Sequence, residues 1–112
     1  MKHNIDGQDA ESVVAKYLEN NGFKIVDRNW KTRQCEIDIV AKKDNCIYFV
    51  EVKYRSSSSQ GDGFEYITSN KLRQMSFAGE LWVAQNKWQS EYCLSGASLS
   101  GPDFEVEFIE EI

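Results

Sequence analysis

The sequence is poor in the residues and patterns on which several kinds of functional site and targeting signal depend. It has one histidine, His3, close to the N-terminus, which argues against histidine-based catalysis and histidine-rich metal sites. No apolar run approaches the roughly 18 residues that span a bilayer, and the first residues lack the apolar core of a signal peptide. The sequence therefore predicts a cytoplasmic protein with no membrane partner.

Cysteine is also scarce. Cys35, Cys46 and Cys93 are odd in number, and none of their spacings is that of a zinc-ligand pair. We expect buried or half-buried thiols in a reducing cytosol rather than a disulfide framework or a zinc site.

The acidic net charge is distributed unevenly along the chain. The 112 residues carry a formal charge of −5 and are enough for one domain, which we expect to cover residues 1–112. Residues 24–73 hold ten of the thirteen Lys and Arg against seven acids, a balance of +3, whereas the remainder has a balance of −8. A locally basic face on an acidic protein is compatible with a polyanionic partner such as nucleic acid.

Hydrophobic periodicity predicts two helices and several strands. Residues 7–21 fit an amphipathic helix, which Gly22 would close in the left-handed conformation. Thr68 and the two residues after it offer caps for a second helix that ends at about residue 85. Strands are expected over residues 23–30, 35–41, 47–53 and 104–108, and residues 92–94 are compatible with a short strand.

A polar Ser/Gly segment over residues 55–63 separates the third strand from the second helix. It has no core-forming residue and is too short to link two domains. We expect a mobile loop of the kind that closes over a substrate.

The strands at 35–41 and 47–53 place acids where a folding chain usually avoids them. Residues 42–45 between them read as a turn, so the two strands are expected to form a hairpin. A turn centred between residues 44 and 45 puts Asp38 opposite Glu51, and Glu36 opposite Lys53. Like charges directly opposite each other are destabilising, so a divalent cation between Asp38 and Glu51 would explain the pair. The alternative is a solvated hairpin face, since a one-residue slip would undo the pairing.

Motifs that run through most of the chain resemble a known family. Glu-Ile-Asp-Ile-Val occupies residues 36–40, and Phe-Val-Glu-Val-Lys-x-Arg occupies residues 49–55. Ala-Glu at 10–11, Arg-Asn-Trp at 28–30 and Lys-Leu at 71–72 extend the match. The combination resembles the YraN-like family of small bacterial proteins, in the PD-(D/E)XK nuclease superfamily. The chain departs from the family at Cys35, where glycine is usual, and over residues 87–101.

The resemblance implies both a fold and an activity. The expected fold is α/β (α+β), a restriction-endonuclease-like core with a central mixed sheet flanked by helices in the order α-β-β-β-α-β. The expected activity is metal-dependent hydrolysis of phosphodiester bonds in DNA, with branched DNA as the substrate. A catalytically inactive nucleic-acid-binding module on the same fold is the alternative, and a protein-interaction role is a third.

The resemblance also implies roles for particular residues. Asp38 and Glu51 would bind Mg²⁺ or Mn²⁺, with the carbonyl of Val52 as a third ligand. Glu11 would be an additional ligand, directly or through water, although a first-turn acid that favours the helix dipole is the alternative reading. Lys53 would orient or help deprotonate the attacking water.

DNA binding must depend on the local basic residues. Arg55 follows the charged strand directly, and Lys71 and Arg73 open the second helix. We expect these three to contact phosphates, the alternative for the helix pair being ordinary surface solvation. A cleaving enzyme of this size is expected to form a homodimer in order to reach two strands.

Overall fold

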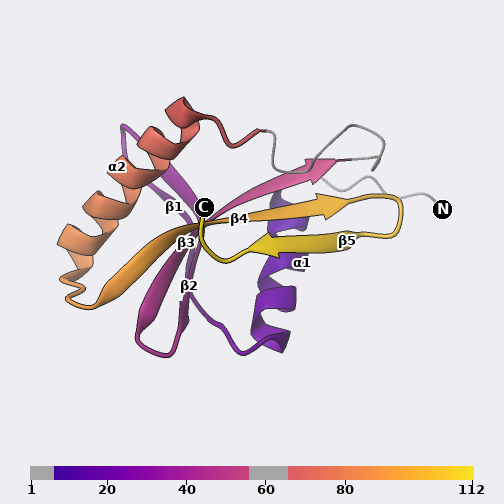
Figure 1. Cartoon of the computed structure of the whole chain (residues 1–112), viewed down its shortest axis with the longest axis horizontal. Coiled ribbons are helices and arrows are strands. Elements are labelled where there is room, and N and C mark those ends of the chain that lie inside the picture. The colour runs from indigo at the N-terminus through magenta and orange to yellow at the C-terminus, as the bar shows by residue number, and fades with distance from the viewer. Residues whose placement is uncertain (1–6, 56–65) are drawn as a thin grey trace.

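The computed structural model describes residues 7–55 and 66–112, with side chains described from residue 9 onward. The predicted loop over residues 55–63 therefore lies outside the described residues beyond its first position. The elements, in chain order, are α1 (Gly7–Asn20), β1 (Lys24–Lys31), β2 (Glu36–Lys43), β3 (Cys46–Arg55), α2 (Ser69–Asn86), β4 (Glu91–Ser100) and β5 (Glu105–Ile109) (Figure 1).

The strands form one mixed sheet in the order β1-β2-β3-β4-β5, with β3 and β4 parallel and the other neighbours antiparallel. The parallel step requires a crossover, which α2 provides. Each helix contributes to a different hydrophobic cluster: Val14 and Leu18 of α1 pack in one, and Ala78 and Trp82 of α2 in the other. The predicted fold class, a mixed sheet flanked by helices, is confirmed.

The helix ends follow the local signals in the sequence. Gly22, the second residue after α1, has φ 90°, the left-handed conformation predicted for it. The side chain of Thr68 accepts a hydrogen bond of 3.1 Å from the backbone N–H of Lys71, which caps α2. The predicted caps are confirmed, and the Thr68 cap fixes the start of α2.

The region after α2 differs from the sequence prediction. The short strand over residues 92–94 is in fact the ten-residue strand β4, which pairs with both β3 and β5. The alternation typical of a half-exposed strand is missing because residues 95–99 are all buried. Ser95 is fully buried, and its hydroxyl donates a 2.6 Å hydrogen bond to the carbonyl of Glu110.

Close packing holds α2 against the strand that carries Glu51. A Cβ placed on Gly79 of α2 would lie 3.0 Å from the ring of Phe49 on β3. Phe49 also packs edge to face against Trp82, with ring centroids 5.6 Å apart. The glycine therefore permits an approach of helix and strand that a larger residue would oppose.

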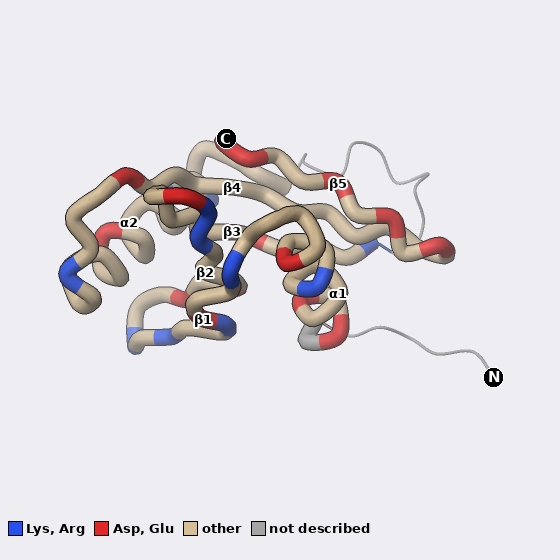
Figure 2. Tube along the Cα trace, turned by 90° about the horizontal axis from the view of Figure 1, so that it is seen from below, with Lys and Arg blue, Asp and Glu red and all other residues tan. Residues whose placement is uncertain are grey.

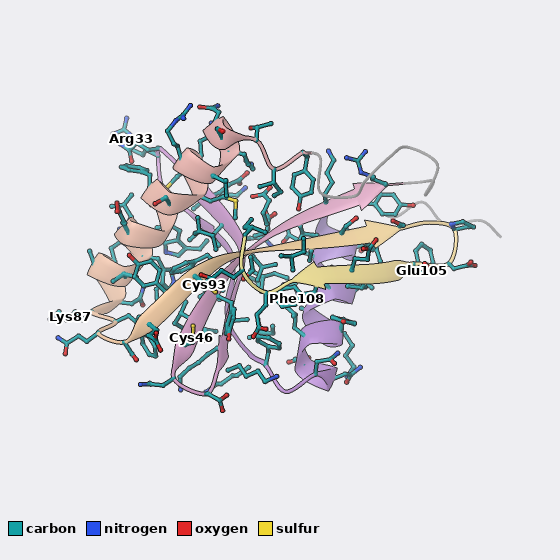
Figure 3. All side chains as sticks on the ribbon, in the orientation of Figure 1. Arg33, Cys46, Lys87, Cys93, Glu105 and Phe108 are labelled. Carbon is teal, nitrogen blue, oxygen red and sulfur yellow. The ribbon has the colours of Figure 1, made fainter. Side chains whose placement is uncertain are left out.

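The three cysteines are free and half-buried, as predicted. Cys46 and Cys93 lie on the neighbouring strands β3 and β4 (Figure 3).

Acidic positions spread along β5 toward the C-terminus (Figure 2). Neither of the two described helices is long and apolar enough to cross a membrane.

Candidate functional site

The candidate site lies where the pairing of β2 with β3 ends. Their ladder runs from Lys43 opposite Cys46 to Ile39 opposite Val50, which is the register predicted from the turn. Asp38 and Glu51 are the next residue on each strand.

Beyond the ladder, a side chain joins the two strands. The Asp38 Oδ2 atom accepts a hydrogen bond of 2.8 Å from the backbone N–H of Val52. This hydrogen bond gives the Val52 N–H an acceptor just beyond the end of the β2–β3 ladder, and it holds the Asp38 carboxylate next to β3.

The two carboxyl groups are half-buried and influence each other. Burial raises the pKa of Asp38, and the charge of Glu36 adds to the rise, while the Val52 N–H opposes it. Burial also raises the pKa of Glu51, and the negative charge of Asp38 raises this pKa further, whereas the positive charge of Lys71 lowers it. Both groups are therefore costly to ionise in this arrangement, as expected of acids that a cation would stabilise.

Glu11 reaches the same place from α1. Its side chain is only 9% exposed because α1 lies on the sheet through the neighbouring Ala10 and Val14. Burial raises its pKa to about 7, the charge of Asp38 contributes to the rise, and Arg28 lowers it. Among the described residues, the buried Oε1 atom of Glu11 has no hydrogen-bond partner. An unpartnered buried carboxyl oxygen is expensive, and it is available to a ligand.

A lysine reaches the site from the other helix. The Lys71 Nζ atom, in the first turn of α2, lies 3.2 Å from Oε2 of Glu51. The two side chains are 34% and 18% exposed, so water only partly screens their attraction. We refer to Asp38, Glu51 and Glu11 as the carboxyl cluster. Lys71, predicted from the sequence as a phosphate contact, therefore lies directly at this cluster, in contact with Glu51.

The other predicted residues lie around this cluster at different depths. Lys53 shares the strand face of Glu51 by alternation, but its side chain is exposed, and the lysine in contact with Glu51 is Lys71. Arg55 is half-buried at the end of β3, and its Nε atom has no hydrogen-bond partner among the described residues. Arg73 is exposed, and its Nη2 atom donates to Oδ1 of Asn70 at 3.4 Å.

Sequence reasoning missed Tyr66. Its hydroxyl donates a 3.0 Å hydrogen bond to the backbone carbonyl of Glu51. Burial raises the pKa of this phenol, and the charges of Glu51 and Asp38 add to the rise, which places the ring at the site. Five tyrosines occur in the chain, and no local pattern distinguishes this one.

The donor set fits a hard cation. Asp38, Glu51 and Glu11 offer carboxyl oxygens, one of them buried without a partner among the described residues, and the backbone N–H of Val52 is hydrogen-bonded to Asp38. Within residues 7–55 and 66–112, no three His, Cys, Asp or Glu residues form a ready-made cage. Magnesium commonly takes one or two carboxylates and keeps several waters, so a complete protein cage is not required.

Comparison with known proteins relates most of the chain to one family. The model of "Uncharacterised protein family UPF0102" matches residues 10–106. A UPF0102 protein of Cytophaga hutchinsonii is 29% identical over 110 residues, which cover 98% of this chain and 97% of the relative. A UPF0102 protein of Geobacter metallireducens is 43% identical over 72% of this chain and 66% of its own length. A UPF0102 protein of Thermotoga maritima is 40% identical over 74% of this chain and 75% of its own length.

Proposed function

This chain belongs to the protein family UPF0102, and we propose that it is a metal-dependent DNA endonuclease of the PD-(D/E)XK type, similar to the YraN-like proteins. The observation that carries the proposal is that Asp38 influences two further acids from two other elements, Glu51 on β3 and Glu11 on α1, with a buried oxygen of Glu11 left unpartnered among the described residues. Buried acids that oppose one another weaken a fold, so their convergence is typical of a functional site.

Each residue has a role that its position supports. Asp38 and Glu51 would hold Mg²⁺ or Mn²⁺, with Glu11 and the carbonyl of Val52 completing the protein ligands. When bound, the cation would lower the pKa of a water molecule and neutralise charge on the scissile phosphate. Asp38 is already oriented by the Val52 N–H, so little rearrangement of that side chain is needed.

Two lysines are candidates for positioning the attacking water. Lys53 has this role in the family that the motif resembles, and its exposed side chain is free to turn toward a substrate. Lys71 lies 3.2 Å from Glu51 and supplies a positive charge at the carboxylates themselves. Arg55, Lys71 and Arg73 would contact the phosphates on either side of the bond that is cut.

An inactive nucleic-acid-binding module is the second candidate, and one contact favours it. The ion pair between Lys71 and Glu51 engages an oxygen that a metal ligand would need. On that reading, the lysine replaces the cation and the cluster serves binding alone.

A cleavage assay distinguishes the two candidates. The protein is incubated with linear, single-stranded, forked and four-way-junction DNA, with magnesium, manganese or EDTA. An enzyme cuts at least one substrate with metal and none with EDTA, and Asp38→Asn and Glu51→Gln abolish cutting. Glu80→Gln is the matched control, because Glu80 is an exposed acid on α2. Binding without cutting under every condition would favour the inactive module.

Metal binding is tested separately by calorimetry with manganese. Asp38→Ala and Glu51→Ala should each abolish the binding, and unchanged affinity in both variants would refute the assignment. The expected homodimer is tested by sedimentation in the presence and absence of junction DNA, and a monomer with bound and cleaved DNA would contradict it.

A further inference from the structure

A cleft of about 600 Å³ opens beside Glu51. One wall is formed by residues 31–36, which join β1 to β2, and the other by residues 71–77 of α2. Figure 3 shows Arg33 at the β1–β2 connection, beside the upper part of α2. Of the three acids at the candidate site, Glu51 therefore lines this cleft.

The cleft is basic although the protein is acidic. Lys31 and Arg33 on one wall face Lys71 and Arg73 on the other, and the acids of the lining are Glu36 and Glu51. Glu36 forms an ion pair with Lys31 at 3.8 Å, and Glu51 forms one with Lys71 at 3.2 Å. Neither of these two ion pairs includes Arg33 or Arg73. Arginine side chains on opposite walls suit a phosphodiester backbone that runs between them.

An aromatic ring stands among these charges. Phe77 lines the cleft and is 49% exposed, whereas its helix neighbours Ala78 and Gly79 are buried in the contact with the sheet. Arg73 lies four residues earlier, on the same face of α2. An exposed aromatic ring beside basic groups is the arrangement on which unpaired bases stack, whereas paired bases inside a duplex have no free face to offer.

We propose that this cleft binds a single-stranded segment of the nucleic acid, with its phosphates between Arg33 and Arg73 and one unpaired base stacked on Phe77. The proposal rests on the proposed function and adds the substrate class, a strand that is unpaired next to the cut. Phe77 lies six residues after Lys71, about 9 Å along the helix axis. At about 3.4 Å per stacked nucleotide, the stacked base is two or three nucleotides from the carboxyl cluster.

The test measures binding without cleavage, so its failure and that of the nuclease proposal are distinguishable. Fluorescence anisotropy in EDTA and at low salt follows a labelled 12-nucleotide oligothymidine, the corresponding duplex, and a glutamate peptide of equal charge. We expect the single strand to bind more tightly than the other two. Equal binding of the peptide would instead assign the cleft to an acidic polypeptide and overturn the proposal.

Variants of the aromatic ring test stacking. Phe77→Ala should weaken single-strand binding roughly 5- to 150-fold and leave duplex binding nearly unchanged, because a stacked base contributes about that factor. Phe77→Trp should restore or strengthen binding. Phe104→Ala is the control, since Phe104 is 43% exposed at the β4–β5 turn, next to Glu105 at the far end of the molecule (Figure 3). Equal losses on single strand and duplex, or no loss in Phe77→Ala, would overturn the stacking role.

Variants of the two arginines test the phosphate contacts. The double variant Arg33→Ala, Arg73→Ala should reduce the slope of log affinity against log salt by about 1.4, at about 0.7 per contact for a single strand. An unchanged slope would place the strand elsewhere. Circular dichroism checks that each variant is folded, and both arginines are exposed, so their replacement leaves the core intact.

Discussion

Replacing Glu11 by glutamine should stabilise the protein and weaken its metal site at the same time. Glu11 is 9% exposed, and its pKa in the fold is about 7, against an ordinary value of 4.5. Because the folded pKa is raised, the protonated form is the one that the fold accommodates. The stability contributed by that form is fully present below pH 4.5 and is lost as the pH rises toward 7 and beyond.

The size of the effect follows from the shift. One pKa unit corresponds to about 1.36 kcal/mol, so the cost of ionising Glu11 in the fold approaches about 3 kcal/mol above pH 7. Glutamine keeps the shape and never ionises. The free energy of unfolding of Glu11→Gln should therefore match that of the parent at about pH 4.5, and exceed it by an amount on the order of 2–3 kcal/mol at pH 8.

Urea unfolding at a series of pH values measures this difference directly. Glu19→Gln is the matched control, because Glu19 is an exposed acid on the same helix and its replacement should change stability by about 0.5 kcal/mol or less. A difference between Glu11→Gln and the parent that does not grow with pH would refute the reasoning.

Added manganese provides a second readout of the same variant. A cation that binds only the folded protein stabilises it by about 2.7 kcal/mol at a hundred times its Kd. The parent should gain this stabilisation at pH 8, and Glu11→Gln should gain less at the same manganese concentration. Equal gains would show that Glu11 is not a ligand.

Three further predictions concern the surroundings of the cluster. Lys71→Met should raise the pKa of the Glu51 carboxyl further, because the positive charge that lowers this pKa is lost. Carbon-13 NMR titration measures the pKa of Glu51, and an unchanged pKa would contradict the ion pair. Tyr66→Phe should cost about 1 kcal/mol of unfolding free energy through the lost hydrogen bond to the Glu51 carbonyl, and no change in urea unfolding would argue against that bond. Thr68→Ala should cost about 1 kcal/mol by removing the α2 cap, whereas Ser76→Ala, at an exposed helix position, should cost little.

Much of the fold and part of the site followed from local sequence patterns. The helix ends at Gly22 and Thr68 were predicted because capping depends on residues adjacent in the chain. The register that brings Asp38 beside Glu51 was predicted because a tight turn fixes which residues of a hairpin face each other. The sequence by itself thus determined the two central acids.

Only the tertiary structure decided the rest. The strand β4 was underestimated because its buried small residues lack an alternating pattern, and its burial depends on β3, β5 and both helices. Glu11 was expected at the site only through the family resemblance, Lys71 was expected only as a phosphate contact, and Tyr66 was missed. The packing of α1 and α2 on the sheet sets where Glu11 and Lys71 approach the two acids, and Tyr66 reaches them from the segment before α2. That packing depends on long-range side-chain contacts, such as the one between Gly79 and Phe49, for which local periodicity carries no signal.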